Sequence, residues 1–124
     1  MIKIILDTNF LVYCAENKID FKERISEIVD EGYGLVVPNL VVIELKRLVE
    51  TAVKLSDREA AGLALKMLEK SGAKIVQVES RNADGAIIKL SKGNIVATLD
   101  FELRKKLKES RVLVVEGHKK IAFR

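Results

Sequence analysis

The chain has 124 residues, of which 48% are hydrophobic, 32% are charged and 5% are aromatic, and its formal net charge is +4. A chain of this size buries roughly two thirds of its unfolded surface, so it can form one domain with one core, and the composition excludes a disordered or fibrous protein. The longest stretch without a charged residue, residues 32–43, has twelve residues, fewer than the ~20 that a membrane-spanning helix needs. We therefore expect a single domain over residues 1–124 and no membrane segment.

The single cysteine and the single histidine exclude several kinds of active site. One cysteine, Cys14, allows neither an internal disulfide nor a multi-cysteine zinc cluster. One histidine, His118, allows neither the paired imidazoles of a histidine-dependent ribonuclease nor a His-Glu-x-x-His metalloprotease motif. We interpret Cys14 as a core residue and His118 as a surface residue. Because Asp7 comes too early for a signal peptide, we expect a cytoplasmic protein.

Aliphatic runs alternate along the chain with stretches in which apolar residues recur every three or four positions. In chain order these patterns predict a strand at residues 2–6, a helix at 20–31, a strand at 35–37, helices at 39–55 and 57–71, a strand at 75–78, a helix at 83–91, a strand at 95–98, a helix at 101–109 and a strand at 112–115. The aliphatic runs lack strict alternation, which is typical of strands that are buried on both faces. Gly32 and Gly72 are expected to end the helices before them, and Pro38 to precede the helix at 39–55.

The alternation of strands and helices predicts a three-layer α/β/α sandwich with a mostly parallel sheet. Parallel neighbours need crossover connections, and helices supply them. No linker rich in Pro, Gly or Ser and no internal repeat divides the chain. The pattern of residues 118–124 leaves two interpretations open, an edge strand or a loose tail.

Three aspartates stand near the ends of predicted strands. Asp7 follows the first strand and leads into a helix, Asp84 lies just beyond the loop after the third, and Asp100 follows the fourth. Ligands of an open parallel sheet gather outside the carboxyl ends of its strands, so these residues share one rim. Each of them alone has an ordinary interpretation as a helix N-cap or as a partner of the helix dipole.

A fourth acid, Glu44, lies on the apolar stripe made by Val41, Leu45 and Leu48. A carboxylate in that position is costly unless it has a partner, and a helix packed on the sheet rim would direct it toward the three aspartates. The alternative is an ion pair with Arg47, three residues further along the helix.

Asp7, Glu44, Asp84 and Asp100, here called the acidic quartet, favour a metal site when they are taken together. At 5 Å and an effective dielectric constant of 20, two carboxylates repel each other by about 3 kcal/mol, and a divalent cation removes that repulsion. Carboxylate oxygens without a nearby Cys or His select Mg²⁺ or Mn²⁺ over Zn²⁺. Such an ion activates water and screens a phosphate, so the quartet predicts metal-assisted phosphodiester hydrolysis.

Polar residues beside the quartet have two interpretations that the sequence leaves open. Thr98 is an ordinary strand residue, or its hydroxyl orients Asp100 or a metal-bound water. Thr8 and Asn9 cap the first helix, or they hold the Asp7 carboxylate and a scissile phosphate. The basic residues of the last predicted helix also have two interpretations: they form a solvated face, or they contact nucleic-acid phosphates. These residues are Arg104, Lys105, Lys106 and Lys108.

Four segments of the chain, taken in order, resemble the PIN-domain nuclease family. They are Asp-Thr-Asn at residues 7–9, Val-Ile-Glu-Leu at 42–45, Asn-Ala-Asp-Gly-Ala-Ile at 82–87 and Thr-Leu-Asp-Phe-Glu-Leu at 98–103. The resemblance covers nearly the whole chain, and residues 95–98 with the basic helix after Asp100 are similar to the branch that contains ribosomal-RNA-processing nucleases. Gly85 stands where that branch often has a second Asp, and Leu99 stands where an Asn is frequent.

The resemblance implies a sheet, a site and a reaction. The implied sheet is parallel and five-stranded, with the order 3-2-1-4-5. The acidic quartet would bind the metal, Thr8 and Thr98 would support it, and Glu102 matches an accessory acid of some members. The resemblance further implies RNA cleavage that leaves 5′-phosphate products, and frequent dimerisation.

The leading hypothesis is an endoribonuclease that depends on Mg²⁺ or Mn²⁺. The three aspartates of the quartet would hold the metal, Glu44 would bind it or orient the water, and Arg104, Lys105 and Lys108 would bind the RNA. Two settings are open: ribosomal-RNA maturation, with ribosome-assembly factors as partners, and the toxin of a toxin–antitoxin pair, with an antitoxin protein as partner. A PIN-like RNA-binding or assembly module without activity is the alternative class.

Overall fold

The computed structural model describes residues 1–117 and 119–124 and is an α/β fold. Its strands are β1 (Ile2–Leu6), β2 (Tyr33–Pro38), β3 (Lys74–Val76), β4 (Ile95–Ala97), β5 (Arg111–Glu116) and β6 (Lys120–Phe123). Its helices are α1 (Thr8–Glu16), α2 (Phe21–Ile28), α3 (Asn39–Thr51), α4 (Leu55–Ser71), α5 (Ala83–Ser91) and α6 (Phe101–Lys105). The interpretation of His118 as a surface residue concerns a residue outside those described.

One six-stranded sheet runs through the described residues in the order β3-β2-β1-β4-β5-β6. Strands β1 to β5 pair in parallel, so the implied order 3-2-1-4-5 is confirmed. The sixth strand is an addition to the five that were expected. It pairs antiparallel with β5, with Leu113 opposite Phe123, so residues 120–123 of the tail form an edge strand.

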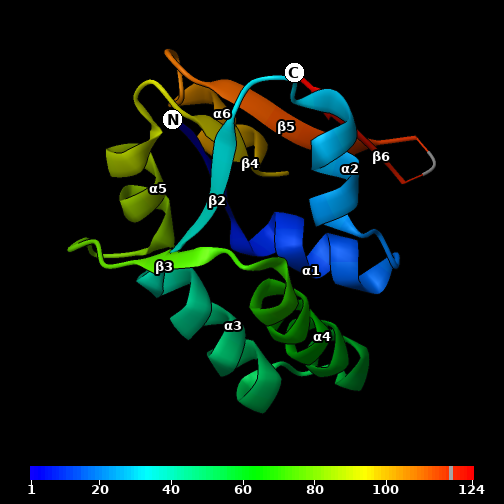
Figure 1. The fold of residues 1–124 in the computed structure, drawn as a ribbon. Helices are drawn as coiled ribbons and strands as arrows, with labels where there is room; N and C mark the ends of the chain where they lie inside the picture. Colours follow the sequence, from blue (N-terminus) through cyan, green and yellow to red (C-terminus); the bar gives the residue numbers. More distant parts are fainter. Residues whose placement is uncertain (118) are drawn as a thin grey trace.

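Helices cover both faces of the sheet, as the three-layer prediction requires. In Figure 1, α5 lies on one side of β2, and α1 and α2 lie on the other side. Helix α5 packs on β1, β2 and β4, whereas α1 and α3 pack against α4. Figure 1 also shows that α1, α3 and α5 begin near the same edge of the sheet. That edge is the one at which β1 and β2 end.

The two central strands form the middle of the core. Residues 4–6 of β1 and all of β4 are fully buried, as predicted for strands covered on both faces. Strand β3 differs because it lies at one edge of the sheet, and its Ile75 is 58% exposed. It also ends two residues before the predicted end, since the Val78 N–H leaves the sheet and donates to Asn39 Oδ1 at 2.9 Å.

Several helix ends differ from their predictions. Helix α2 ends at Ile28 and not at residue 31, because Val29 has extended backbone and packs its side chain into the core, so Gly32 does not end the helix. Helix α3 ends four residues early and α4 begins two residues early, because residues 52–54 form a turn that contains neither Pro nor Gly. Gly72, with φ +76°, ends α4 as predicted.

Helix α6 is shorter than predicted, ending at Lys105 and not at residue 109. Its N-terminus is at Phe101, as predicted, with Asp100 as the N-cap. The chain turns back because Leu107 is buried in the core, with its N–H donating to Arg104 O at 3.1 Å. The residues that follow lead directly into β5.

Two predictions drawn from the composition concern the cysteine and the membrane. Cys14 is fully buried in the core, as expected, and burial raises its pKa to about 12. Among the described residues, no helix combines the length and the apolar character that crossing a membrane requires.

Candidate active site

Asp7 lies at the end of β1, where it caps α1, and it is 3% exposed. Its Oδ1 accepts a hydrogen bond from Thr8 N–H at 2.8 Å, and its Oδ2 accepts one from the Thr98 hydroxyl at 2.6 Å. Burial raises the pKa of Asp7 to about 6. The hydrogen bonds from Thr98 and Thr8 lower this pKa, and the charges of Asp84 and Glu44 raise it. Asp7 is therefore a buried carboxylate held in one orientation.

Thr98 links the carboxyl ends of β1 and β4. Its hydroxyl donates to Asp7 and accepts a hydrogen bond from Asp100 N–H at 3.1 Å. Asn9 adds a second link, because its side-chain oxygen accepts from Leu99 N–H at 2.9 Å and lies 3.3 Å from Thr98 Oγ1. These bonds hold the two aspartates together at the point where the strand order of the sheet reverses, which is where ligands bind in open α/β sheets.

Asp100 is the N-cap of α6. Its Oδ1 accepts hydrogen bonds from Glu102 N–H at 2.9 Å and from Leu103 N–H at 3.1 Å. The ordinary interpretation of Asp100 as a helix cap is therefore correct. It is compatible with a second role, because both of these bonds are made to the same oxygen.

Asp84 lies in the first turn of α5, whose N-cap is Asn82, with Gly85 N–H donating to Asn82 Oδ1 at 2.9 Å. It is half-buried, and burial is the main reason that its pKa is raised. The negative charges of Asp100 and Glu44 raise it further, and Lys106 lowers it. Since another residue caps the helix, the carboxylate of Asp84 is not needed for that purpose.

The acidic quartet lines one pocket of about 360 Å³ at this edge of the sheet. The lining residues are Asp7, Thr8, Asn9, Val12, Glu44, Leu48, Asp84 and Asp100. Glu44 itself is exposed on α3, beside the half-buried Leu48. Four helices and two strand ends thus bring together acids that lie up to 93 positions apart in the chain.

The other sequence-predicted residues lie outside the pocket lining. Thr98 is fully buried and bonded to Asp7. Glu102 and Lys105 form an exposed ion pair of 3.5 Å on α6. Arg104 is half-buried on the same helix, and Lys108 is exposed beyond its end.

Sequence reasoning missed the apolar wall of the pocket and one of its cations. Val12 and Leu48 form the wall. Each lies four residues after a polar residue of the site, Thr8 and Glu44, so the helical repeat was a signal that could have found them. Lys106 was assigned only to a run of bases, although its charge acts on Asp84.

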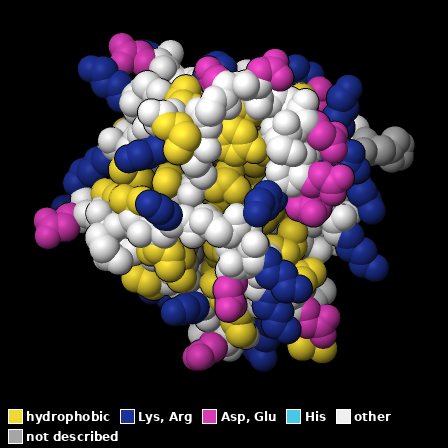
Figure 2. All heavy atoms as spheres, viewed as in Figure 1, with side chains coloured by type: hydrophobic (Ala, Val, Ile, Leu, Met, Phe, Trp, Pro, Cys, Tyr) yellow, Lys and Arg dark blue, Asp and Glu magenta, His cyan; other side chains and the backbone are white. Residues whose placement is uncertain are grey.

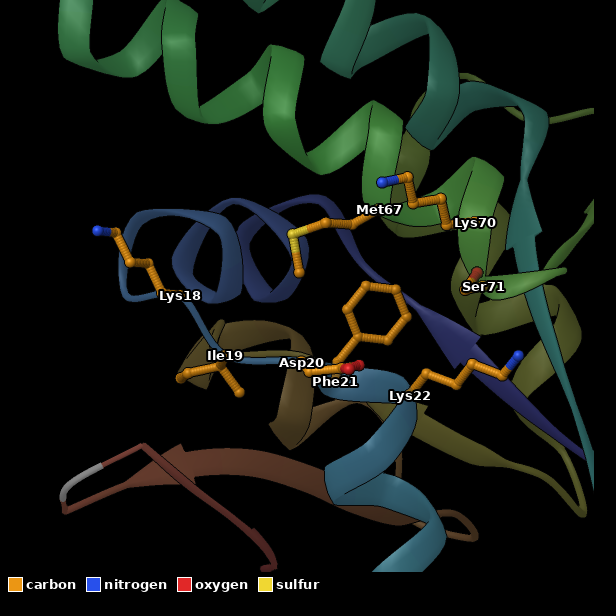
Figure 3. Close-up of a pocket in the computed structure, with 8 residues that line it drawn as sticks. All are labelled: Lys18, Ile19, Asp20, Phe21, Lys22, Met67, Lys70 and Ser71. Atoms are coloured by element: carbon orange, nitrogen blue, oxygen red, sulfur yellow. The ribbon is translucent and has the colours of Figure 1, made fainter.

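A second pocket, of about 330 Å³, differs in its chemistry. Figure 3 shows the Phe21 ring and the Met67 side chain between α1, α2 and α4, with three lysines around them. The one carboxylate in the lining, Asp20, caps α2 through Glu23 N–H. This pocket lacks the converging acids of the first.

The donor set of the quartet pocket fits a hard divalent cation. All four acids offer oxygen, and the pKa values of Asp7 and Asp84 are raised in part by their negative neighbours, a repulsion that a cation would relieve. Among the described residues, Thr8 Oγ1 is a buried side-chain oxygen without a hydrogen-bond partner, and Thr8 lines this pocket. Within residues 1–117 and 119–124, however, no three His, Cys, Asp or Glu side chains stand ready to hold an ion. Binding would therefore require the acids that line the pocket to move closer together.

Comparisons with known proteins identify the family and agree with the fold. A family profile described as "PIN like domain" matches residues 4–120. Ribonuclease VapC4 of Methanocaldococcus jannaschii is 33% identical over 126 residues, which cover 99% of this chain and 95% of that protein.

Solved structures share the fold. The PIN domain endonuclease Utp24 matches with a TM-score of 0.79 and 23% identity, over 98% of this chain and 90% of that one. VapBC2 from Rickettsia felis, solved bound to a DNA fragment from its promoter, matches with a TM-score of 0.64 and 14% identity, over 93% of this chain and 100% of that one. The family match over most of the sequence, together with the 33% identical relative, shows that this chain belongs to the PIN-domain nuclease family.

Proposed function

We propose that the chain is an endoribonuclease that uses a divalent metal ion and acts in the cytoplasm as a single domain over residues 1–124. The observation that supports it most is the convergence of the acidic quartet on one pocket at the ends of β1 and β4. The relative named a ribonuclease adds support, and nucleases of this family generally use divalent metal ions. The all-oxygen donor set favours Mg²⁺ or Mn²⁺.

The polar residues of the pocket have proposed roles. The three aspartates of the quartet would hold the ion, and Glu44 would bind it or orient the attacking water. When bound, such an ion lowers the pKa of water and screens the charge of the scissile phosphate. Thr98 would act as a positioning residue, because it holds both Asp7 and Asp100. Thr8 and Asn9, which line the pocket, would donate to a phosphate oxygen.

The chemical identity of the product ends distinguishes this reaction from other ribonuclease chemistry. Attack by water breaks the bond between phosphorus and the 3′-oxygen, leaving a 3′-hydroxyl and a 5′-phosphate. Attack by the neighbouring 2′-hydroxyl would leave a 2′,3′-cyclic phosphate and a 5′-hydroxyl, and that reaction is typically served by paired imidazoles, which a chain with one histidine lacks.

A fluorescent single-stranded RNA tests the proposal directly. Wild-type protein with Mg²⁺ or Mn²⁺ should cut it to 5′-phosphate products, EDTA should stop the reaction, and Asp7→Asn should abolish most of it. Asp30→Asn, an exposed aspartate in the segment between α2 and β2, is the matched control and should keep the wild-type rate. If wild type and Asp7→Asn leave the RNA equally uncut, the chain is a binding or assembly module instead.

The biological setting has two candidates, each with an observation in its favour. The basic residues of α6 favour ribosomal-RNA processing, in which ribosome-assembly factors or a second copy of the chain would be partners. The relative named VapC4 favours a toxin with an antitoxin partner. Growth arrest on expression, dependent on Asp7, would favour the toxin. Selective cutting of precursor ribosomal RNA without growth arrest would favour processing.

A further inference from the structure

Phe101 is an exposed aromatic residue that directly follows Asp100, one of the acids lining the pocket. It is 61% exposed, whereas Phe10 and Phe21 are 0% and 1% exposed in the core. It follows Asp100 directly, so the Cα atoms of these two residues are about 3.8 Å apart. Single exposed apolar residues are common on protein surfaces, so the meaning of Phe101 depends on what surrounds it.

Two cations of α6 lie over the Phe101 ring. Arg104 Cζ is 5.7 Å and Lys105 Nζ is 4.9 Å from the ring centroid. They follow Phe101 by three and four residues, the spacing that puts side chains on one face of a helix. Lys105 also forms an ion pair with Glu102, and the two side chains are 59% and 77% exposed. Because solvent screens this ion pair, it holds Lys105 only weakly.

The positive charge continues from the ring toward the pocket. Lys106, the residue that follows the last residue of α6, acts on the charge of Asp84, which lines the pocket. An exposed aromatic ring with cations close to it is the combination with which proteins bind single-stranded nucleic acid: bases stack on the ring, and the cations bind the backbone phosphates. Here that combination begins one residue after an acid of the quartet.

We propose that Phe101, Arg104 and Lys105 form a subsite for one unpaired nucleobase of the RNA strand, which stacks on the Phe101 ring while the two cations bind the adjacent phosphate. The inference rests on the proposed ribonuclease function and deepens it, because it makes an unpaired base beside the scissile phosphate the feature that the enzyme recognises. A base in a duplex is already stacked and paired, so it reaches the ring only when its pair opens. Every base has a π-face, so the subsite tolerates different sequences.

Tryptophan fluorescence tests the subsite without any cleavage. The chain contains no tryptophan, so Phe101→Trp introduces a unique reporter. In an Asp7→Asn background with Mg²⁺, single-stranded RNA should quench its emission, and the matched duplex should do so much less. Val53→Trp, in the 96% exposed position between α3 and α4, is the control and should respond to neither. Equal responses to strand and duplex, or no response to the strand, would overturn the proposal.

A series at position 101 measures the stacking contribution. Phe101→Ala and Phe101→Leu should weaken binding of single-stranded RNA by roughly five- to 150-fold, the range typical of one base stacked on an aromatic ring, whereas Phe101→Tyr should bind like wild type. The loss should appear in KM more than in kcat. Melting temperatures should be unchanged, because the ring is exposed.

An RNA with one abasic position tests which base of the strand stacks on the Phe101 ring. When the abasic position is moved along the strand, wild type should bind the RNA weakly at one distance between that position and the cut. At this distance Phe101→Ala should bind the RNA no more weakly than wild type does. If wild type cuts RNA but binding depends on residue 101 at no such distance, the subsite is wrong while the ribonuclease proposal stands. If the fluorescence responds to single strands but wild type cuts nothing, the subsite stands and the ribonuclease proposal fails. A Phe101→Ala protein that binds RNA normally but loses a protein partner would show that the ring is a protein-docking residue.

Discussion

Asp7 is buried where β1 ends, and its negative charge is opposed there by lost hydration and by two neighbouring acids. Two hydrogen bonds, from Thr98 and Thr8, offset part of that cost without removing it, since its pKa stays at about 6. A protein gains nothing in stability from such a group when no ligand is present. Its presence at the strand end is explained if a cation completes the site.

The metal-free protein should lose stability as the pH rises from about 4 to above 6. In this range the folded chain keeps a proton on Asp7 that the unfolded chain has already released, because the pKa is raised from 3.8 to about 6. The stability from protonated Asp7 is thus present at low pH and is lost as the pH passes 6. At 1.36 kcal/mol per unit, the loss is about 3 kcal/mol.

Urea unfolding in EDTA at several pH values measures this loss. Asp7→Asn carries no titrating group at the position and should show a flatter dependence of the unfolding free energy on pH. Two parallel curves would contradict the assignment of the raised pKa to Asp7.

Replacing Thr98 by valine should affect both stability and the pH dependence of cleavage. The side chains are similar in size, but valine leaves Asp100 N–H and Asp7 Oδ2 without their partner, at a cost of about 1–3 kcal/mol. The pKa of Asp7 should rise further, because the bond from Thr98 lowers it, so the rising limb of the activity profile should move to higher pH. Thr98→Ser keeps the hydroxyl and should restore the wild-type profile. An unshifted profile in Thr98→Val would show that Thr98 only fills space.

Among the elements, those with strong periodic patterns were predictable, whereas several of their ends were not. Val29 continues the apolar stripe of the predicted helix. In the structure it has an extended backbone, and its side chain is buried in the core. The turn at residues 52–54 has no Pro or Gly, so the sequence reads as one continuous helix. The sequence of β6 has only a weak strand pattern. The strand forms because it can pair antiparallel with the free edge of β5. For Val29 and for β6 a tertiary contact decides the conformation, and a local sequence pattern does not contain that contact.

Helix α6 is short, and its basic residues should dominate the salt dependence of RNA binding. Arg104→Gln and Lys105→Gln should each reduce the slope of log Kd against log salt by about 0.7, the value expected for one phosphate contact with a single strand. Lys108→Gln tests the cation beyond the helix in the same way. Lys66→Gln, on the exposed side of α4, is the control and should leave the slope unchanged. Slopes that respond equally to all four changes would indicate diffuse attraction and no defined contact.

On the scale of the whole molecule, the candidate site is a product of the sheet topology. The order of the strands places the ends of β1 and β4 side by side, so the positions of Asp7 and Asp100 followed from the parallel fold alone. The contributions of Val12 and Leu48 depend on where the helices α1 and α3 lie around the pocket, and local sequence patterns do not determine that. On the face shown in Figure 2, the Lys and Arg side chains are spread over several elements among acids, so the net charge of +4 does not form one patch there.

Binding of a divalent ion should stabilise the whole fold, because the ion binds the quartet only when distant parts of the chain come together. At a concentration one hundred times its dissociation constant, a ligand adds about 2.7 kcal/mol to the unfolding free energy, which raises the melting temperature of a domain of this size by roughly 10 °C. Asp84→Asn should lose most of the increase with Mn²⁺, and it should be more stable than wild type in EDTA, since burial and two acids oppose the charge of Asp84. Asp57→Asn, at the start of α4, is the matched control and should keep the full increase. If Mn²⁺ leaves the melting temperature of wild type, Asp84→Asn and Asp57→Asn unchanged, the four acids do not act as one site.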